Sequence, residues 1–160
     1  DSVTVHQRSD VPYGLFFSGG IDSTLILYLM SISSTKSVDC FTILFPGDEE
    51  KKQKISLLAK KFNSKVNFVE FNSKDFWSYL PKTIKFLDDP IADYATVPTF
   101  RLAEVASKNV KVVLTGEGGD EMFAGYGRYR SELRRVMRKT FLQKGTNFVK
   151  NCASFIQMTS

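Results

Sequence analysis

Short apolar runs alternate along the chain with stretches whose apolar residues have helical spacing. The runs are bounded by turn residues and cover residues 14–17, 38–45, 66–71 and 110–115. The stretches with helical spacing cover approximately residues 23–31, 49–62, 76–86 and 98–107. Short apolar strands that alternate with amphipathic helices are typical of domains with a mostly parallel sheet. The pattern therefore predicts an α/β fold in which helices flank a parallel sheet.

Three segments add detail to this pattern. The helix predicted over residues 49–62 has one apolar face and five lysines that we expect to face water: Lys51, Lys52, Lys54, Lys60 and Lys61. Residues 87–97 contain a proline and two adjacent acids, and their apolar residues show neither helical nor strand spacing. This indicates an ordered loop, and loops of this length are often found at functional sites. Later in the chain, Leu133, Val136 and Met137 have helical spacing among basic residues, so we expect a helix there that leads away from the sheet.

The composition is typical of one domain with a substantial core. The chain has 160 residues, of which 42% are hydrophobic, including 14 Phe. We expect a core over residues 1–130, followed by the start of a basic helical region over residues 131–160. The apolar runs are far shorter than the roughly 20 residues that a membrane-spanning helix needs, so the sequence predicts no membrane partner.

The net charge of +5 is concentrated in one segment. Residues 128–150 hold eight Lys or Arg and a single acid, Glu132. A basic segment of this kind can bind nucleic acid. It more often forms a solvated helix face or a contact with another domain, so we do not expect nucleic acid as a partner.

The cysteines and the histidine do not form a metal-ligand pattern. Cys40 and Cys152 are far apart and lack CxxC spacing, so neither a zinc site nor a disulfide framework is indicated. This usage favours a reducing cytoplasm. We expect Cys40, which lies in an apolar run, to be buried, and His6, the only histidine, to be a surface or packing residue.

The sequence SGGIDST, residues 18–24, lies between a predicted strand and a predicted helix. Gly19 and Gly20 let the backbone approach an anion without a Cβ in the way, and the free N–H groups of the helix start attract negative charge. The motif matches neither the P-loop pattern with its lysine nor GxGxxG. Asp22 fits such a loop if it holds Mg²⁺ against phosphate groups. The structural alternative is a glycine-rich turn with Asp22 as a helix cap.

The sequence TGEGGDEMFAGYGRY, residues 115–129, follows the last predicted strand. In a parallel sheet it emerges at the same carboxyl edge as residues 18–24, where ligands of such sheets bind. Glu117, Asp120 and Glu121 place three acids within five residues. Such a cluster is costly unless a cation or a proton transfer separates the charges. The two motifs together predict a site for phosphate groups and Mg²⁺ at their junction.

The first motif resembles the pyrophosphate loop of the N-type ATP pyrophosphatases, and the second is similar to the second signature of the asparagine synthase family. Residues 8–24 and 88–100 also look like segments of that family, and the resemblance spans roughly residues 1–130. It implies an adenine nucleotide alpha hydrolase-like fold and an ATP-dependent, glutamine-hydrolysing carbon–nitrogen ligase. In that reaction a carboxylate, typically of aspartate, attacks the α-phosphorus of ATP, and ammonia then displaces AMP to form the amide.

The resemblance also implies roles for individual residues. The positions that match the ATP and pyrophosphate site are Phe16, Ser18, Gly19, Gly20, Ile21, Asp22, Ser23, Ile43, Gly116 and Glu117. Asp22 and Asp120 match the Mg²⁺ ligands, and Glu117 matches the acid that orients or deprotonates the incoming amine. Asp88, Asp93 and Thr96 would line the side on which the acyl substrate binds.

The resemblance further implies partners that residues 1–160 do not supply. The chain opens at Asp1 without the nucleophilic cysteine that begins the glutaminase domain of full-length members, so we expect ammonia from a glutaminase domain or subunit. The full-length enzyme would also be a candidate homodimer. None of Lys139, Lys144 and Lys150 can be matched to the catalytic lysine of the family.

Two alternatives remain at this point. The first is an RNA-modifying pyrophosphatase of the same superfamily, which the basic segment favours and the second motif disfavours. RNA-stimulated release of pyrophosphate would support it. The second is a nucleotide-binding module without catalysis, against which the intact Asp22, Glu117 and Asp120 count.

Overall fold

The computed structural model describes residues 2–33, 37–89, 93–129 and 131–138. Contacts divide the chain into two units, Asp1–Gly116 and Glu117–Ser160. The first unit contains the whole sheet. Cys152 and the three lysines at 139, 144 and 150 lie outside the described residues.

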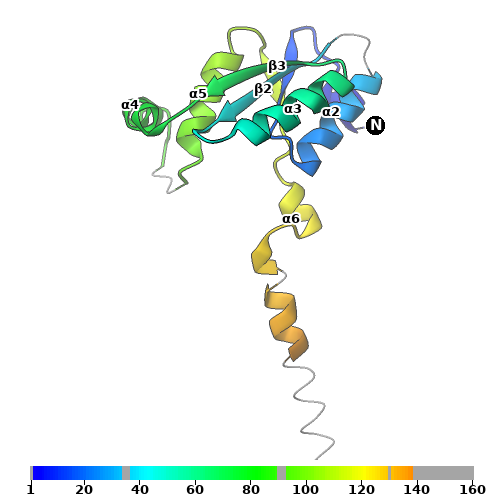
Figure 1. Ribbon diagram of the computed structural model, residues 1–160, viewed down its shortest axis with the longest axis vertical. Helices are drawn as coiled ribbons and strands as arrows, with labels where there is room; N and C mark the ends of the chain where they lie inside the picture. The colour runs from blue at the N-terminus through cyan, green and yellow to red at the C-terminus, as the bar shows by residue number, and fades with distance from the viewer. Residues whose placement is uncertain (1, 34–36, 90–92, 130, 139–160) are drawn as a thin grey trace, which may run out of the picture. The chain divides into compact units, whose positions relative to one another are not determined.

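Four parallel strands form the sheet of the first unit (Figure 1). They are β1 (Tyr13–Phe16), β2 (Asp39–Leu44), β3 (Lys65–Glu70) and β4 (Val112–Leu114). Their order across the sheet is β3-β2-β1-β4. The chain therefore moves from β1 outward in one direction through β2 and β3, then returns to place β4 on the other side of β1. This reversal beside β1 is the topological switch point at which parallel α/β sheets bind ligands.

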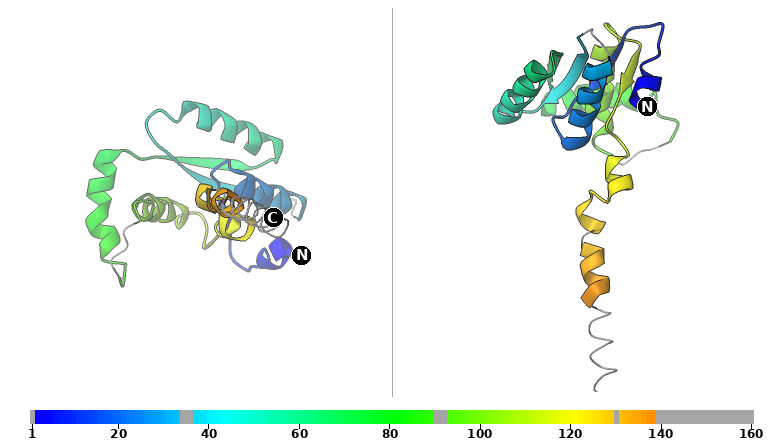
Figure 2. Two further views of the ribbon diagram at one scale, coloured as in Figure 1. Left: turned by 90° about the horizontal axis from the view of Figure 1, so that it is seen from below. Right: turned by 90° about the vertical axis from the view of Figure 1, so that its right-hand side faces the viewer.

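Helices cover both faces of this sheet. α2 (Ile21–Ser33) and α3 (Glu49–Lys61) lie on one face, whereas α5 (Thr96–Ala106) lies on the other, and Figure 2 shows α3 and α5 on opposite sides of the strands. α4 (Ser73–Ile84) packs beside α5, and the short α1 (Ser2–His6) packs beside α2. The predicted α/β architecture with flanking helices is confirmed.

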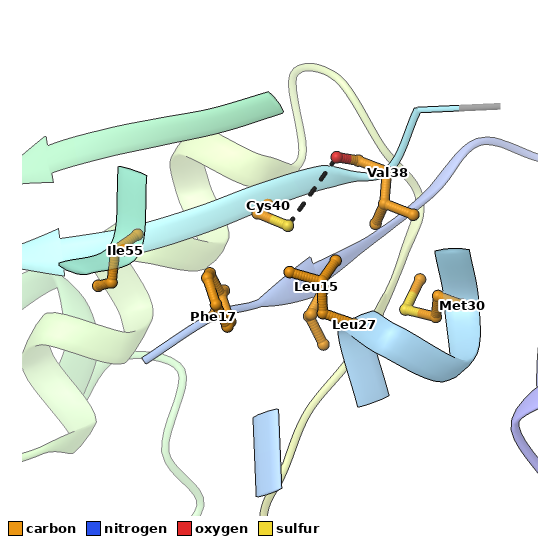
Figure 3. Packing of buried hydrophobic residues seen from close by; sticks show 7 residues of the cluster. All are labelled: Leu15, Phe17, Leu27, Met30, Val38, Cys40 and Ile55. Carbon is orange, nitrogen blue, oxygen red and sulfur yellow. Dashed lines mark hydrogen bonds between the residues drawn. The ribbon is translucent and has the colours of Figure 1, made fainter. Parts of the chain in front are cut away.

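Successive side chains along each strand point to opposite faces of the sheet, so the core consists of two clusters, one on each face. The cluster between the sheet and the helices α2 and α3 is shown in Figure 3 and consists of Leu15, Phe17, Leu27, Met30, Val38, Cys40 and Ile55. The cluster beneath α5 consists of Phe41, Val69, Leu102, Ala106 and Val110. The residues of both clusters are apolar, so the sheet is held from both sides, as a parallel sheet requires.

The element boundaries agree with the sequence predictions to within about three residues. α4 begins at Ser73, earlier than predicted, because Asn72 and Asp75 form a capping box at its start. α1 and α6 (Gly119–Phe123) were not predicted, and neither has a buried residue. One lysine prediction is wrong: Lys51 is only partly exposed, because its ammonium group donates to the Ile43 carbonyl at 3.2 Å and pairs with Asp48.

The single-residue predictions for the cysteine and the histidine are confirmed. Cys40 is fully buried, and this burial raises the pKa of its thiol to about 12. His6 is exposed at the end of α1, where its Nδ1 donates to the Ser2 carbonyl at 2.8 Å. Within the described residues, no group of three or more His, Cys, Asp or Glu side chains is arranged to hold a metal ion.

The second unit begins with α6 and continues in helical conformation over residues 127–129 and 131–138. Leu133, Val136 and Met137 lie in the last of these stretches and are all exposed. The predicted helix at this position is present. In the described part of the chain, no helix combines the length and the apolar character that crossing a bilayer requires.

Candidate functional site

The two sequence motifs start at neighbouring strand ends. β1 pairs with β4 in parallel register, with Leu15 opposite Leu114, so the chain that follows each strand emerges at the same edge of the sheet. The contact is close, because a Cβ built on Gly116 would lie 3.0 Å from the Ser23 amide nitrogen and 3.2 Å from the Asp22 Cβ. Gly116 therefore contacts the start of α2 with its bare backbone, and a side chain there would displace Asp22 and Ser23.

Hydrogen bonds between its own residues shape the loop after β1. The hydroxyl groups of Ser18 and Ser23 share a hydrogen bond of 3.0 Å, and the Gly20 amide donates to the Ser18 hydroxyl at 3.3 Å. The Ser23 hydroxyl also reaches the Gly20 carbonyl at 3.4 Å, and the Thr24 amide donates to the same carbonyl at 3.0 Å. These bonds close the loop onto the first turn of α2, and Ser23 is almost fully buried within it.

The first turn of α2 can accept an anion. α2 starts at Ile21. The amide groups of Ile21, Asp22 and Ser23 therefore have no acceptor within the helix, because the carbonyl four residues earlier lies outside it. These free N–H groups and the positive end of the helix dipole attract negative charge. Gly20 and Ile21 are exposed, which leaves the approach open. The predicted residues from Ser18 to Ser23 are thus brought together with Gly116 in one place.

Gly19 has a conformation that only glycine adopts without strain. Its φ is +74°, in the left-handed region, and the residue is buried. A Cβ at this position would lie 2.9 Å from Cγ1 of Ile55, which is fully buried in α3. The glycine is therefore required twice, by the turn of the backbone and by the packing of α3 against it.

Asp22 has the chemistry that a magnesium site needs. Its carboxylate lies in the first turn of α2 and is partly exposed, and no hydrogen bond or ion pair engages it among the described residues. Carboxylate oxygens are preferred ligands of Mg²⁺, which is usually held by one or two of them together with substrate phosphates. The residue fits the ion in type, exposure and position beside the free amide groups.

Phe16 and Ile43 lie on the opposite side of the sheet from α2. Both are half-buried and pack against the cluster beneath α5. They belong to the paired strands β1 and β2, near the carboxyl ends of both. Each is therefore close in sequence to the edge where the loop lies, and the adenine role assigned to them by resemblance stays a prediction.

The second motif forms a compact turn around α6. Gly118, with φ of +90°, precedes the helix, and Ala124 ends it in the left-handed region with φ of +54°. The Gly125 amide then donates to the Asp120 carbonyl at 3.0 Å, and a Cβ built on Gly125 would overlap the Asp120 carboxylate. The bare backbone at 125 thus leaves the space in which the Asp120 carboxylate lies. Glu117 is exposed at the start of this turn.

Glu121 is held within the same turn by Tyr126. The Tyr126 hydroxyl donates to the Glu121 carboxylate at 2.5 Å, and this hydrogen bond is the main reason why the pKa of Glu121 lies below its ordinary value. The Arg128 guanidinium lies over the rings of Tyr126 and Tyr129, at 4.6 and 5.3 Å from their centroids. Glu121 is therefore a charged, locally paired residue rather than a free acid.

A cavity of about 490 Å³ contains the three residues assigned to the acyl-substrate side. Asp88, Asp93 and Thr96 line it together with apolar side chains of α4, including Phe76 and Leu80. The structure thus brings these three residues to one cavity, and their role toward a substrate stays a prediction. Residues 90–92, in the middle of the predicted loop, lie outside the described residues.

One buried residue at the site was missed by the sequence interpretation. Thr42 in β2 is 2% exposed, and its hydroxyl donates to the Phe17 carbonyl at 2.5 Å, immediately before the loop. Threonine is common in strands, so nothing in the sequence distinguishes this hydroxyl from an ordinary strand residue. Only the pairing of β2 with the end of β1 reveals its contact.

Comparison with known proteins identifies sequence relatives over most of the chain. The model of the asparagine synthase family matches residues 1–155. Asparagine synthetase (glutamine-hydrolyzing) 1 of Bacillus subtilis is 39% identical over 138 residues, 83% of this chain and 21% of the relative. The putative asparagine synthetase (glutamine-hydrolyzing) 2 of Methanocaldococcus jannaschii is 35% identical over 144 residues, 87% of this chain and 28% of the relative. The chain thus spans between a fifth and just over a quarter of their lengths.

A solved structure shares the fold. The NH3-dependent NAD synthetase of Campylobacter jejuni, in complex with a nitrate ion, superposes with a TM-score of 0.52 at 19% identity. The match covers 79% of this chain and 57% of that one. At this level of identity the likeness establishes the architecture alone, and it confirms the predicted adenine nucleotide alpha hydrolase-like fold.

Proposed function

The chain belongs to the asparagine synthase family, and from this premise we propose that it is the ATP-binding, carboxylate-activating part of an amide-forming ligase. One observation carries the proposal. The contact of Gly116 with Asp22 and Ser23 joins the beginning of the second motif to the anion-binding loop of the first. A nucleotide triphosphate whose phosphates meet the loop would therefore lie at the switch point of the sheet, beside the Thr115–Gly116 start of the second motif.

The proposed first step is adenylation. A carboxylate oxygen of the acyl substrate attacks the α-phosphorus of ATP, the bond from that phosphorus to the bridging oxygen breaks, and pyrophosphate leaves. The leaving group gains negative charge, which the amide groups at the start of α2 and the hydroxyl of Ser18 can stabilise. Bound Mg²⁺ would neutralise phosphate charge, and Asp22, with Asp120 of the second motif, would hold it.

The proposed second step forms the amide. Ammonia attacks the acyl carbon, AMP leaves with the electron pair of the broken bond, and a proton is lost from the nitrogen. Glu117, an exposed carboxylate at the start of the second motif, is the proposed acceptor of that proton. Aspartate is the proposed acyl substrate, with the cavity at Asp88, Asp93 and Thr96 on its side, and glutamine hydrolysis elsewhere in the enzyme is the proposed source of ammonia.

The test is pyrophosphate release by the complete protein from ATP and Mg²⁺, with aspartate and ammonium added separately and together. Asp22→Asn keeps the shape of the side chain and removes its charge, and it should lower aspartate-dependent release on the order of 100-fold. Asp10→Asn is the matched control, since Asp10 is exposed before β1 at the opposite edge of the sheet. Release that is stimulated by RNA and indifferent to aspartate would contradict the proposal and support the RNA-modifying alternative.

A further inference from the structure

The Thr42 hydroxyl is a buried polar group in an otherwise apolar layer. Thr42 lies two residues beyond Cys40 on β2, so its side chain points to the face that α2 and α3 cover. Valine has the same shape and would suit this layer without a polar atom to satisfy. The hydroxyl is instead paired with a backbone carbonyl, that of Phe17.

The acceptor of this hydrogen bond is the last carbonyl before the loop. The regular pairing of β1 with β2 continues as far as the Phe17 amide, which donates to the Phe41 carbonyl at 2.9 Å. The Phe17 carbonyl then accepts from the side chain of Thr42. The hydroxyl of Thr42 thus holds the carbonyl oxygen of the Phe17–Ser18 peptide, and this fixes the orientation of that peptide.

The orientation of this peptide decides where Ser18 lies. The Ser18 hydroxyl bonds both the Gly20 amide and the Ser23 hydroxyl, so a rotation of the Phe17–Ser18 peptide would break both bonds. Gly19, packed against Ile55, has no space in which to absorb such a rotation. The loop therefore has one conformation while Thr42 holds its entry, and others become accessible without it.

We propose that Thr42 is a positioning residue for the anion-binding loop. It contacts no substrate itself, and it acts by fixing the peptide from which the Ser18 hydroxyl and the amide groups of the loop project. Groups that are aligned before the ligand arrives bind it more tightly than groups that must be ordered on binding. The inference rests on the proposed function for its ligand, which is pyrophosphate as the free ion or as part of ATP.

Three variants of the complete protein separate positioning from stability. Thr42→Val removes the hydroxyl and keeps the shape, and Thr42→Ser keeps the hydroxyl. The matched control for pyrophosphate binding is Thr83→Val, because Thr83 is also 2% exposed and its hydroxyl donates to the Tyr79 carbonyl at 3.0 Å within α4. Thr83 lines the cavity proposed for the acyl substrate, so all variants are compared without that substrate. Thr42→Val and Thr83→Val each lose one buried hydrogen bond, so their losses of stability should be similar.

The first measurement is the affinity for inorganic pyrophosphate with Mg²⁺, by calorimetry. Thr42→Val should bind roughly three- to tenfold more weakly than the wild type, as expected for the loss of one aligned hydrogen bond. Thr42→Ser should restore most of the affinity, and Thr83→Val should bind like the wild type. Equal binding by Thr42→Val and the wild type, or equal weakening by both valine variants, would overturn the inference.

A second measurement needs no ligand and therefore tests the positioning role of Thr42 separately from the proposed function. Amide hydrogen exchange over residues 18–24 should become faster in Thr42→Val and stay unchanged in Thr83→Val. If the wild type binds no pyrophosphate, the proposed function fails, while the exchange rates still decide whether Thr42 positions the loop. Unchanged exchange in Thr42→Val would overturn the inference even where pyrophosphate binds.

Discussion

Gly19 and Gly116, both in the first unit, contact other elements of the fold, whereas Gly125 in the second unit contacts the residue five positions before it. Gly19 packs against Ile55 of α3, and Gly116 packs against the start of α2. In the second unit, Gly125 makes room for Asp120, and Tyr126 holds Glu121. The glycines of the first unit thus depend on the packing of its elements, while the second unit has contacts that a short segment can make alone. Their sensitivity to mutation should differ accordingly.

The largest effect is expected from the residue that supports the first loop. Ile55→Ala leaves a cavity beneath Gly19 and should lower the free energy of unfolding by about 2–5 kcal/mol, measured by urea denaturation. Leu57→Ala is the control on the same helix, since Leu57 is 70% exposed and its loss should cost less than about 0.5 kcal/mol. Comparable losses in the two variants would contradict the difference in packing.

A smaller effect is expected from the glycine itself. Gly19→Ala combines a strained φ with a contact of 2.9 Å to Ile55, and it should cost about 1–3 kcal/mol of stability. Gly47→Ala has a similar φ of +92° and nothing within 4 Å of the new Cβ, so it measures the strain alone. The excess cost of Gly19→Ala over Gly47→Ala is the contribution of the contact with α3. No excess would mean that α3 gives way to the new side chain.

In the second motif, an added methyl group should change function more than stability. Gly125→Ala displaces the Asp120 carboxylate, and the Mg²⁺ concentration needed for half-maximal pyrophosphate release should rise on the order of 10-fold. Gly127→Ala is the control, because nothing lies within 4 Å of a Cβ there. The free energy of unfolding should change little in either variant. An unaltered requirement for Mg²⁺ in Gly125→Ala would remove Asp120 from the proposed site.

The smallest expected effect is a change in the pKa of Glu121. Tyr126→Phe removes the hydrogen bond to Glu121, so the pKa of Glu121 should rise toward its ordinary value, measured by NMR. Because the folded pKa is lowered, the stabilisation from this pair is present above the ordinary glutamate pKa and is lost as the pH falls through the lowered value. Tyr129→Phe should leave the titration unchanged. An equal response in Tyr129→Phe, or none in Tyr126→Phe, would show that the hydrogen bond from Tyr126 does not lower the pKa of Glu121.

The sequence predicts the fold well where burial imposes a pattern. Every strand in the described residues was predicted, because apolar side chains on both faces of a parallel sheet produce short continuous runs such as residues 38–45. α6 was missed because five residues with no buried side chain have no periodicity to detect. The capping box of Asn72 and Asp75 was a readable signal for the start of α4 that the interpretation did not use.

For the site, motifs predict which residues meet and say little about what holds them. The meeting of the Ser18–Ser23 loop with Gly116 follows from two parallel strands and the glycines after them. The contribution of Thr42 depends on which strand lies beside β1 and in which register, and both are decided by the whole sheet. The Gly125 amide that bonds the Asp120 carbonyl follows Ala124 in the left-handed conformation, which alanine seldom adopts, so the sequence does not indicate this turn.

The position of β1 between β2 and β4 also imposes an order of assembly on a growing chain. Tyr13 pairs with Val112, a residue synthesised almost a hundred positions later. Until β4 emerges from the ribosome, one edge of β1 presents unpaired amide and carbonyl groups, and the loop after it lacks Gly116. Nascent chains that end before residue 112 therefore have β1 as an open edge strand available to other chains, and completion of β4 closes that edge and the anion site in the same event.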